Sequence, residues 1–82
     1  MTEQEKNIYE AWLKDFGRCV AMRRKTLGLT QKQAAERVGM HKKFYRDIEY
    51  GLRPITTRTL FQLCMRLDLT LPYSEAMIFV CD

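Results

Sequence analysis

The chain of 82 residues has the length of one small domain, and its 46% hydrophobic and 29% charged residues are the balance of a globular protein rather than a disordered one. Its longest apolar run, residues 76–81, has six residues, far fewer than the ~18 that a membrane-spanning helix requires. The first residues are polar and acidic, unlike a secretory signal. We therefore expect a single domain, residues 1–82, located in the cytoplasm and without a membrane partner.

Charge is unevenly distributed along the chain, whose formal net charge is +4. Residues 16–66 contain twelve basic and three acidic side chains, net +9, whereas residues 1–15 carry net −2 and residues 67–82 net −3. A basic middle with acidic ends favours a surface for a polyanion on one part of the domain. A solvated lysine and arginine surface is the alternative.

The cysteines and the single histidine do not form the pattern of a metal site. Cys19, Cys64 and Cys81 are widely spaced, with no Cys-x-x-Cys pair, and His41 is the only histidine. Cys19 and Cys64 fall on apolar helical positions, where a reduced thiol behaves as a small hydrophobe. The sequence contains no Gly-rich phosphate loop or nucleophile elbow. We therefore expect no metal, no cofactor and no enzymatic activity.

A capping box at residues 2–5 begins the first expected helix. Apolar residues follow it at three- to four-residue spacing as far as Leu27, the pattern of an amphipathic helix. Because Gly17 interrupts this stripe, the segment forms either one long helix or two helices in series. We prefer a leading helix over residues 3–14 joined closely to a second helix over residues 16–26.

Two short helices are expected in the middle of the chain. A second capping box at residues 30–33 begins the first of them, Gly39 ends it, and residues 41–50 form the next. The glycine permits the sharp turn between the two helices. Tyr45 and Ile48 are predicted to face inward, which leaves an outward ridge of Lys42, Lys43, Arg46 and Asp47. A two-turn helix with such a ridge fits the major groove of DNA.

The end of the chain is predicted from one cap and one break. Thr56 begins a helix whose apolar stripe covers residues 60–67, and Pro72 breaks the chain again. Residues 72–82 either close the core as a last short helix or form an apolar tail for dimerisation. The candidate interface residues of that tail are Met77, Ile78, Phe79 and Val80. Taken together, these elements predict an all-α fold of five or six helices.

The sequence resembles the Cro/phage-repressor type of helix-turn-helix protein, the XRE-like family. The resemblance covers residues 16–69 and rests on Phe16-Gly17, Arg24, Gly28-Leu29-Thr30-Gln31, Ala35, Gly39, Glu49, Gly51 and Leu60-x-x-Leu63-Cys64. Residues 49–56, Glu-Tyr-Gly-Leu-Arg-Pro-Ile-Thr, look especially like small controller proteins of restriction-modification systems. Short phage and plasmid repressors share most of these positions. The resemblance implies a Cro/repressor-like DNA-binding domain and a transcriptional regulator.

The resemblance also assigns roles to individual residues. Base edges would be read by His41, Lys42, Lys43, Phe44 and Asp47. Backbone phosphates would be held by Thr30, Gln31, Arg46 and Arg53. Arg24 and Glu49 would form a structural ion pair that links the first helix of the motif to the end of the recognition helix.

Several of these roles have an alternative. Gln31 is otherwise a plain helix-start residue, and the two lysines of the ridge hold phosphates only. Phe44 otherwise belongs to the core or to an interface, and His41 caps its helix or contacts a phosphate. Asp47 either accepts a hydrogen bond from a cytosine amine or is a charge neighbour of Lys43.

One recognition helix makes few base contacts, so the expected assembly is a homodimer on an inverted-repeat operator in double-stranded DNA. Repression and autoregulation require only binding, whereas activation requires a surface that faces the polymerase. One alternative is an antitoxin-like module that neutralises a second protein partner through the apolar tail. Another is a protein that coats nucleic acid without sequence preference.

Overall fold

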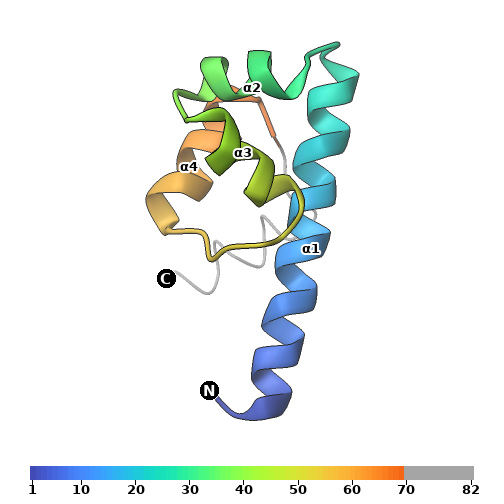
Figure 1. The fold of residues 1–82 in the computed structure, drawn as a ribbon, viewed down its shortest axis with the longest axis vertical. Coiled ribbons are helices and arrows are strands. Elements are labelled where there is room, and N and C mark those ends of the chain that lie inside the picture. Colours follow the sequence, from blue (N-terminus) through green and yellow to red (C-terminus); the bar gives the residue numbers. More distant parts are fainter. Residues whose placement is uncertain (70–82) are drawn as a thin grey trace.

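The computed structural model describes residues 1–69, which form four helices and no strand (Figure 1). The helices are α1 (Glu3–Thr26), α2 (Gln31–Val38), α3 (Lys42–Glu49) and α4 (Thr57–Arg66). The all-α class is as predicted for this part of the chain, but four helices replace the predicted five or six. The expected helix or tail over residues 72–82, including Met77, Ile78, Phe79 and Val80, lies outside the described residues.

Within residues 1–69 the preferred prediction contained one helix too many, because residues 3–26 form one continuous helix. Gly17 lies inside α1 and does not divide it into helices over residues 3–14 and 16–26. Its missing side chain serves packing, because a Cβ at this position would overlap the backbone carbonyl oxygens of Ile48 and Glu49. The glycine that looked like a break therefore lets the end of α3 lie directly against α1.

Side-chain caps fix where three of the helices begin. At α1, the Thr2 hydroxyl accepts a hydrogen bond from the Glu5 amide (3.1 Å) and the Glu5 carboxylate accepts one from the Thr2 amide (3.0 Å). Thr30 and Gln33 form the same reciprocal pair at α2, at 3.1 and 2.9 Å. Thr56 caps α4 with its hydroxyl. Both predicted capping boxes are confirmed.

The core is built from apolar side chains of all four helices. Its largest fully buried members are Val20, Val38, Tyr45, Ile48, Leu63 and Leu67. Burying one such side chain contributes about 1.5–3 kcal/mol to stability. Tyr45 and Ile48 face inward as predicted, so the core fixes which side of α3 is turned outward.

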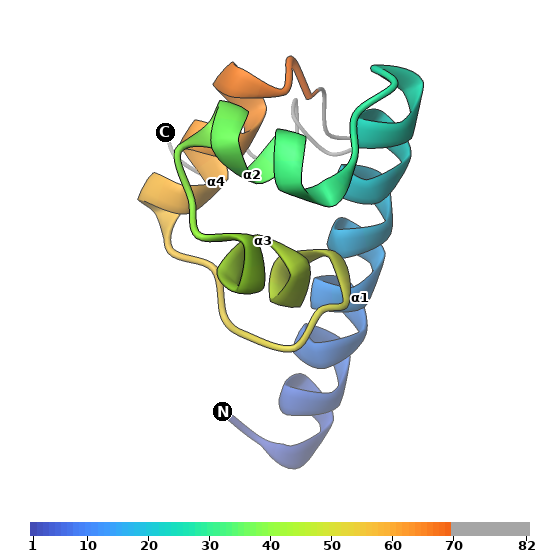
Figure 2. The same ribbon diagram turned by 45° about the horizontal axis from the view of Figure 1, so that its top comes forward.

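The arrangement of the helices places α3 at an open face of the molecule. α3 packs against α1 and α2, while α4 packs against α2. Figure 1 shows α3 in front of α4, and the turned view of Figure 2 shows α3 below α2 and α4. No other described helix covers the outward side of α3 in these views, so that side is available to a ligand.

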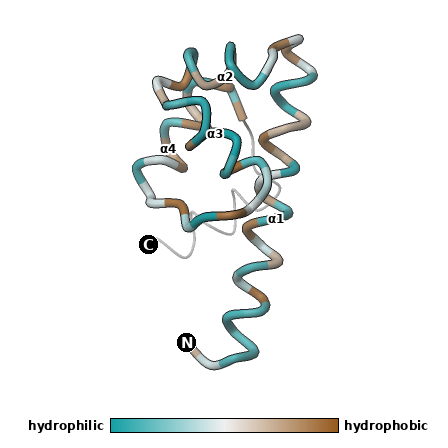
Figure 3. Tube along the Cα trace, in the orientation of Figure 1, coloured by the Kyte–Doolittle hydropathy of each residue, from teal (hydrophilic) through white to brown (hydrophobic). Residues whose placement is uncertain are grey.

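The N-terminal half of α1 extends beyond the rest of the described structure (Figure 1). Its first buried residue is Leu13, and Ile8 is exposed. Figure 3 shows this half as mainly hydrophilic with scattered hydrophobic residues. None of the helices within residues 1–69 combines the length and the apolarity needed to span a bilayer.

Candidate nucleic-acid interface

The outward side of α3 carries the predicted ridge of basic residues. The side chains of Lys42, Lys43 and Arg46 are exposed, while Tyr45 and Ile48 anchor the opposite side of the same helix. α3 has eight residues, about two turns. A helix of this length with exposed cations on one side presents them together to a ligand of opposite charge.

His41 precedes this ridge as the N-cap residue of α3. It is exposed and its side chain makes no capping hydrogen bond. His41 thus occupies the capping position, as one alternative held, but its imidazole supplies no capping hydrogen bond. The side chain is left at the start of the ridge, beside Lys42.

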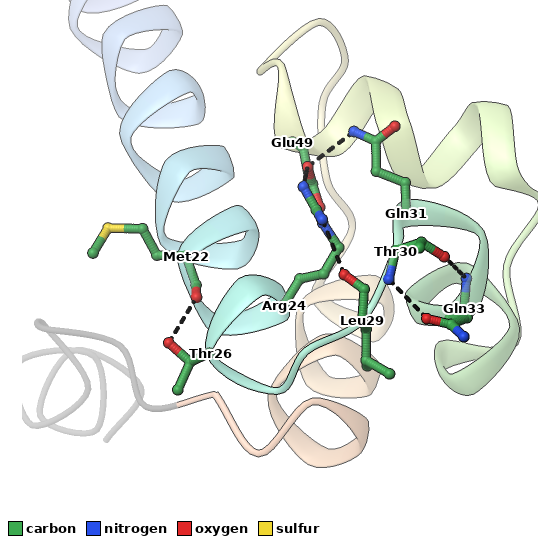
Figure 4. A network of polar contacts seen from close by, with 8 residues as sticks. All are labelled: Met22, Arg24, Thr26, Leu29, Thr30, Gln31, Gln33 and Glu49. Carbon is green, nitrogen blue, oxygen red and sulfur yellow. Dashed lines mark hydrogen bonds and ion pairs between the residues drawn. The ribbon is translucent and has the colours of Figure 1, made fainter.

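Arg24 and Glu49 form the ion pair that the resemblance implied (Figure 4). Arg24 Nε donates to Glu49 Oε2 at 2.7 Å and Nη2 donates to Oε1 at 3.1 Å, while Nη1 donates to the Leu29 carbonyl oxygen at 3.1 Å. The two side chains are only 13% and 2% exposed. One guanidinium group thus joins α1, the segment before α2 and the last residue of α3.

The charges of this pair are stabilised by their surroundings. Burial by itself raises the pKa of the Glu49 carboxyl, but hydrogen bonds from Arg24 and Gln31 and the Arg24 charge outweigh it, so the pKa lies below its ordinary value. The hydrogen bond to Glu49 in turn raises the pKa of Arg24. Both groups are therefore ionised at neutral pH.

The two residues at the start of α2 differ in what their side chains do. Thr30 is exposed and its hydroxyl accepts from the Gln33 amide. Gln31 is half-buried, and its Nε2 donates to Glu49 Oε1 at 3.0 Å (Figure 4). The amide nitrogen that was expected to reach a phosphate is thus engaged inside the protein, where it ties α2 to α3.

Phe44, Asp47 and Arg53 lie together, which sequence reasoning missed. The guanidinium carbon of Arg53 lies 4.4 Å from the centre of the Phe44 ring. Arg53 Nη2 donates to Asp47 Oδ2 at 3.0 Å, and Arg46 Nη2 lies 3.8 Å from Asp47 Oδ1. Asp47 therefore pairs with two arginines and not with Lys43. One feature of the sequence could have indicated this cluster: Phe44 and Asp47 are three residues apart, which puts both on one side of α3.

Two further basic side chains of residues 16–66 donate hydrogen bonds to carbonyl oxygens at the C-terminal end of α4. Arg23 Nε donates to the carbonyl oxygen of Leu67 at 3.0 Å, and Arg37 Nε donates to that of Arg66 at 2.8 Å. These carbonyl groups lie at the end of a helix and have no partner within it. The net charge of residues 16–66 therefore overstates the number of cations available to a polyanion.

Within residues 1–69, no group of three or more histidine, cysteine or acidic side chains is placed to hold a metal ion. Cys19 and Cys64 are free and half-buried. Burial raises the pKa of the Cys64 thiol.

Comparison with known proteins agrees with this geometry. The model of the helix-turn-helix family matches residues 20–74, which include α2, α3 and α4. The solved structure of the restriction-modification controller protein C.AhdI from Aeromonas hydrophila is similar, with a TM-score of 0.69 and 27% sequence identity, over 73% of this chain and 91% of that chain. No curated protein matches the chain. Because the family model covers more than half of the chain, the protein belongs to the helix-turn-helix family of the XRE type and is a DNA-binding regulator.

Proposed function

We propose that the protein is a sequence-specific transcriptional regulator that binds an inverted-repeat operator as a homodimer. The observation that carries this proposal is the outward ridge of α3, where Lys42, Lys43 and Arg46 are exposed on a helix anchored by Tyr45 and Ile48. The major groove of B-form DNA admits one α-helix, and exposed cations on that helix face its phosphates and base edges.

The ridge and its flanks divide into two kinds of contact. His41, Lys42 and Lys43 are exposed at the start of α3 and are proposed to read base edges, the lysines at guanine O6 and N7. Thr30 and Arg46 are proposed to contact phosphates on either side. Gln31 contributes by holding α2 in register with α3, since its amide is bonded to Glu49.

The homodimer is proposed to form through α4, away from the ridge. Phe61 and Met65 lie four residues apart on this helix and are 63% and 66% exposed, although both side chains are apolar. A two-fold dimer uses the same patch on both subunits and places two recognition helices about one DNA turn, ~34 Å, apart. We include residues 77–80, which the sequence predicted as interface residues, in this proposed interface.

The sequence preference is tested by selecting bound duplexes from a random library and measuring affinity for a selected duplex and for its scrambled counterpart. We expect Lys42→Ala or Lys43→Ala to cost about 1–3 kcal/mol and to relax the preference at one base pair. Lys6→Ala, on the exposed first half of α1, is the matched control and should leave the preference unchanged. Equal affinity of the wild-type protein for both duplexes would contradict the proposal.

An antitoxin-like module is the second candidate, because the exposed apolar side chains of Phe61 and Met65 also suit a protein partner. Sedimentation of the 9.8 kDa chain distinguishes the homodimeric regulator from the antitoxin-like module. A concentration-dependent dimer that Phe61→Ser converts to a folded monomer supports the homodimer. A wild-type protein that stays monomeric by itself, and sediments as a larger complex only after a second protein is added, supports the antitoxin.

A further inference from the structure

Arg53 is held between two residues of α3, in an arrangement that we call the Arg53 clasp (Phe44, Asp47 and Arg53). The guanidinium carbon lies 4.4 Å from the centre of the Phe44 ring, and Nη2 donates to Asp47 Oδ2 at 3.0 Å. Stacking on a ring and a charge-assisted hydrogen bond fix both the position and the orientation of the guanidinium plane. Arg53 is therefore constrained although it lies on a loop.

The backbone after α3 is folded so that it delivers Arg53 to this position. The Gly51 amide donates to the Ile48 carbonyl oxygen at 3.1 Å and the Leu52 amide donates to the Asp47 carbonyl oxygen at 2.9 Å. With Gly51 at a φ of 67°, this is a Schellman turn, which reverses the chain beside the helix it ends. Residue 53 therefore returns to the side of α3 that carries Phe44 and Asp47.

The clasp leaves part of Arg53 available while it restricts the rest. Its Nε is buried and has no hydrogen-bond partner among the described residues. The side chain as a whole remains 37% exposed, and Asp47 is only 13% exposed. The carboxylate is therefore turned toward the arginines and away from solvent, whereas part of the Arg53 side chain stays exposed beside the ridge.

We infer that Asp47 is a positioning residue that sets DNA sequence preference through Arg53 and does not read a base itself. This inference rests on the proposed function. A guanidinium group held in one place contacts DNA only when α3 is docked in register, whereas a released one contacts the phosphates of any sequence. The Asp47 carboxylate also neutralises part of the cationic ridge, which weakens attachment to DNA of unrelated sequence.

A base-reading role for Asp47 would require a different orientation of its carboxylate. To accept a hydrogen bond from a cytosine amine, the carboxylate would have to leave Arg53 and turn outward from a position that is 13% exposed. That movement would break the 3.0 Å contact and free the guanidinium group from its place over Phe44. The two roles therefore compete, and the observed contact favours positioning.

The test is a double-mutant cycle with four proteins: wild type, Asp47→Asn, Arg53→Gln and the double variant. Each is titrated with a duplex selected by the wild-type protein and with a scrambled duplex of the same composition. We expect Asp47→Asn to bind the scrambled duplex roughly threefold more tightly and to lower the ratio of the two affinities roughly five- to tenfold. In the Arg53→Gln background the same change should leave the ratio unaltered.

Two further variants keep this test decisive. Arg53→Lys keeps the charge but cannot reproduce the planar stacking, and it should lower the ratio in the same direction as Asp47→Asn. Asp68→Asn removes a carboxylate that lies 3.5 Å from Arg23 at the far end of α4, and it should leave the ratio unchanged. Thermal melting of each variant shows that it is folded under the binding conditions.

Three outcomes would overturn the inference. If Asp47→Asn still changes the preference at one C·G pair in the Arg53→Gln background, Asp47 itself reads that base pair. An unchanged ratio in Asp47→Asn, with a preference retained by the wild type, would overturn this inference alone. A wild-type protein without any preference would overturn the proposed function as well.

Discussion

The two sides of α3 use charge in opposite ways. At its inner end, the Glu49 side chain is 2% exposed and is bonded to Arg24 and Gln31. On its outward side, Lys42 and Lys43 are exposed, and neither forms an ion pair with another described residue. The charges of the inner end hold helices together, whereas those of Lys42 and Lys43 remain available to a ligand.

The difference between the two sides of α3 explains how a very short helix can serve as a binding element. An isolated helix of eight residues is unstable in water, so α3 depends on its packing against α1 and α2. The buried pair and the core provide that packing, which lets the ridge keep unpaired cations. Substitutions on the two sides should therefore separate stability from DNA binding.

The largest loss of stability is expected from Arg24→Ala. It leaves the buried Glu49 carboxylate without its main partner, which costs about 3–5 kcal/mol, a large part of the about 5–15 kcal/mol that stabilises a typical domain. Thermal melting and urea unfolding measure it. Arg18→Ala is the matched control, because Arg18 pairs with Asp15 at the surface, with side chains 71% and 66% exposed, and such pairs contribute at most about 1 kcal/mol. An unchanged midpoint in Arg24→Ala would refute the structural role of the pair.

Gly17→Ala should be the next most damaging change at the inner side. The added Cβ would overlap two backbone carbonyl oxygens at the end of α3, which side-chain movement does not relieve. We expect a loss of about 2–3 kcal/mol, although alanine is the better helix former by about 1 kcal/mol. Ala11→Gly, at an exposed position of α1, reports the propensity effect alone. A Gly17→Ala variant that melts at or above the wild-type temperature would contradict the close contact.

Acid should weaken the inner side specifically. Because the pKa of Glu49 is lower in the folded protein, its stabilising contribution is fully present above the ordinary glutamate value of about 4.3 and is lost as the pH falls through the lower folded value. Glu49→Gln lacks this charge at every pH. The melting temperatures of wild type and Glu49→Gln should therefore differ at pH 7 and approach each other as the pH falls below about 4. A constant difference would argue against the assignment.

The smallest effect is expected from Tyr45→Phe. The Tyr45 hydroxyl is buried without a hydrogen-bond partner in the described part of the chain, and burial raises the pKa of the phenol. Removing an unpaired hydroxyl while keeping the ring should change the free energy of unfolding by less than about 1 kcal/mol. Urea unfolding checks this value. A clearly larger loss would show that the hydroxyl bonds to the neighbouring Glu49 carboxylate.

The sequence alone determined the features that depend on near neighbours. The caps at Thr2, Thr30 and Thr56 join atoms three residues apart, so their pattern is visible in the sequence. The spacing of Tyr45 and Ile48 likewise determined which side of α3 is buried. The Arg24–Glu49 pair was predicted from a family resemblance and not from spacing.

Only the tertiary structure decided the roles that depend on how helices meet. Gly17 looks like an interruption until α3 is placed against it. Gln31 looks like a phosphate contact until Glu49, 18 residues away, accepts a hydrogen bond from its amide. Asp47 and Arg53 likewise read as two independent DNA contacts until the Schellman turn brings them together. Local hydrogen bonds and periodicity act within about one helical turn, whereas these pairings depend on a packing that no local pattern specifies.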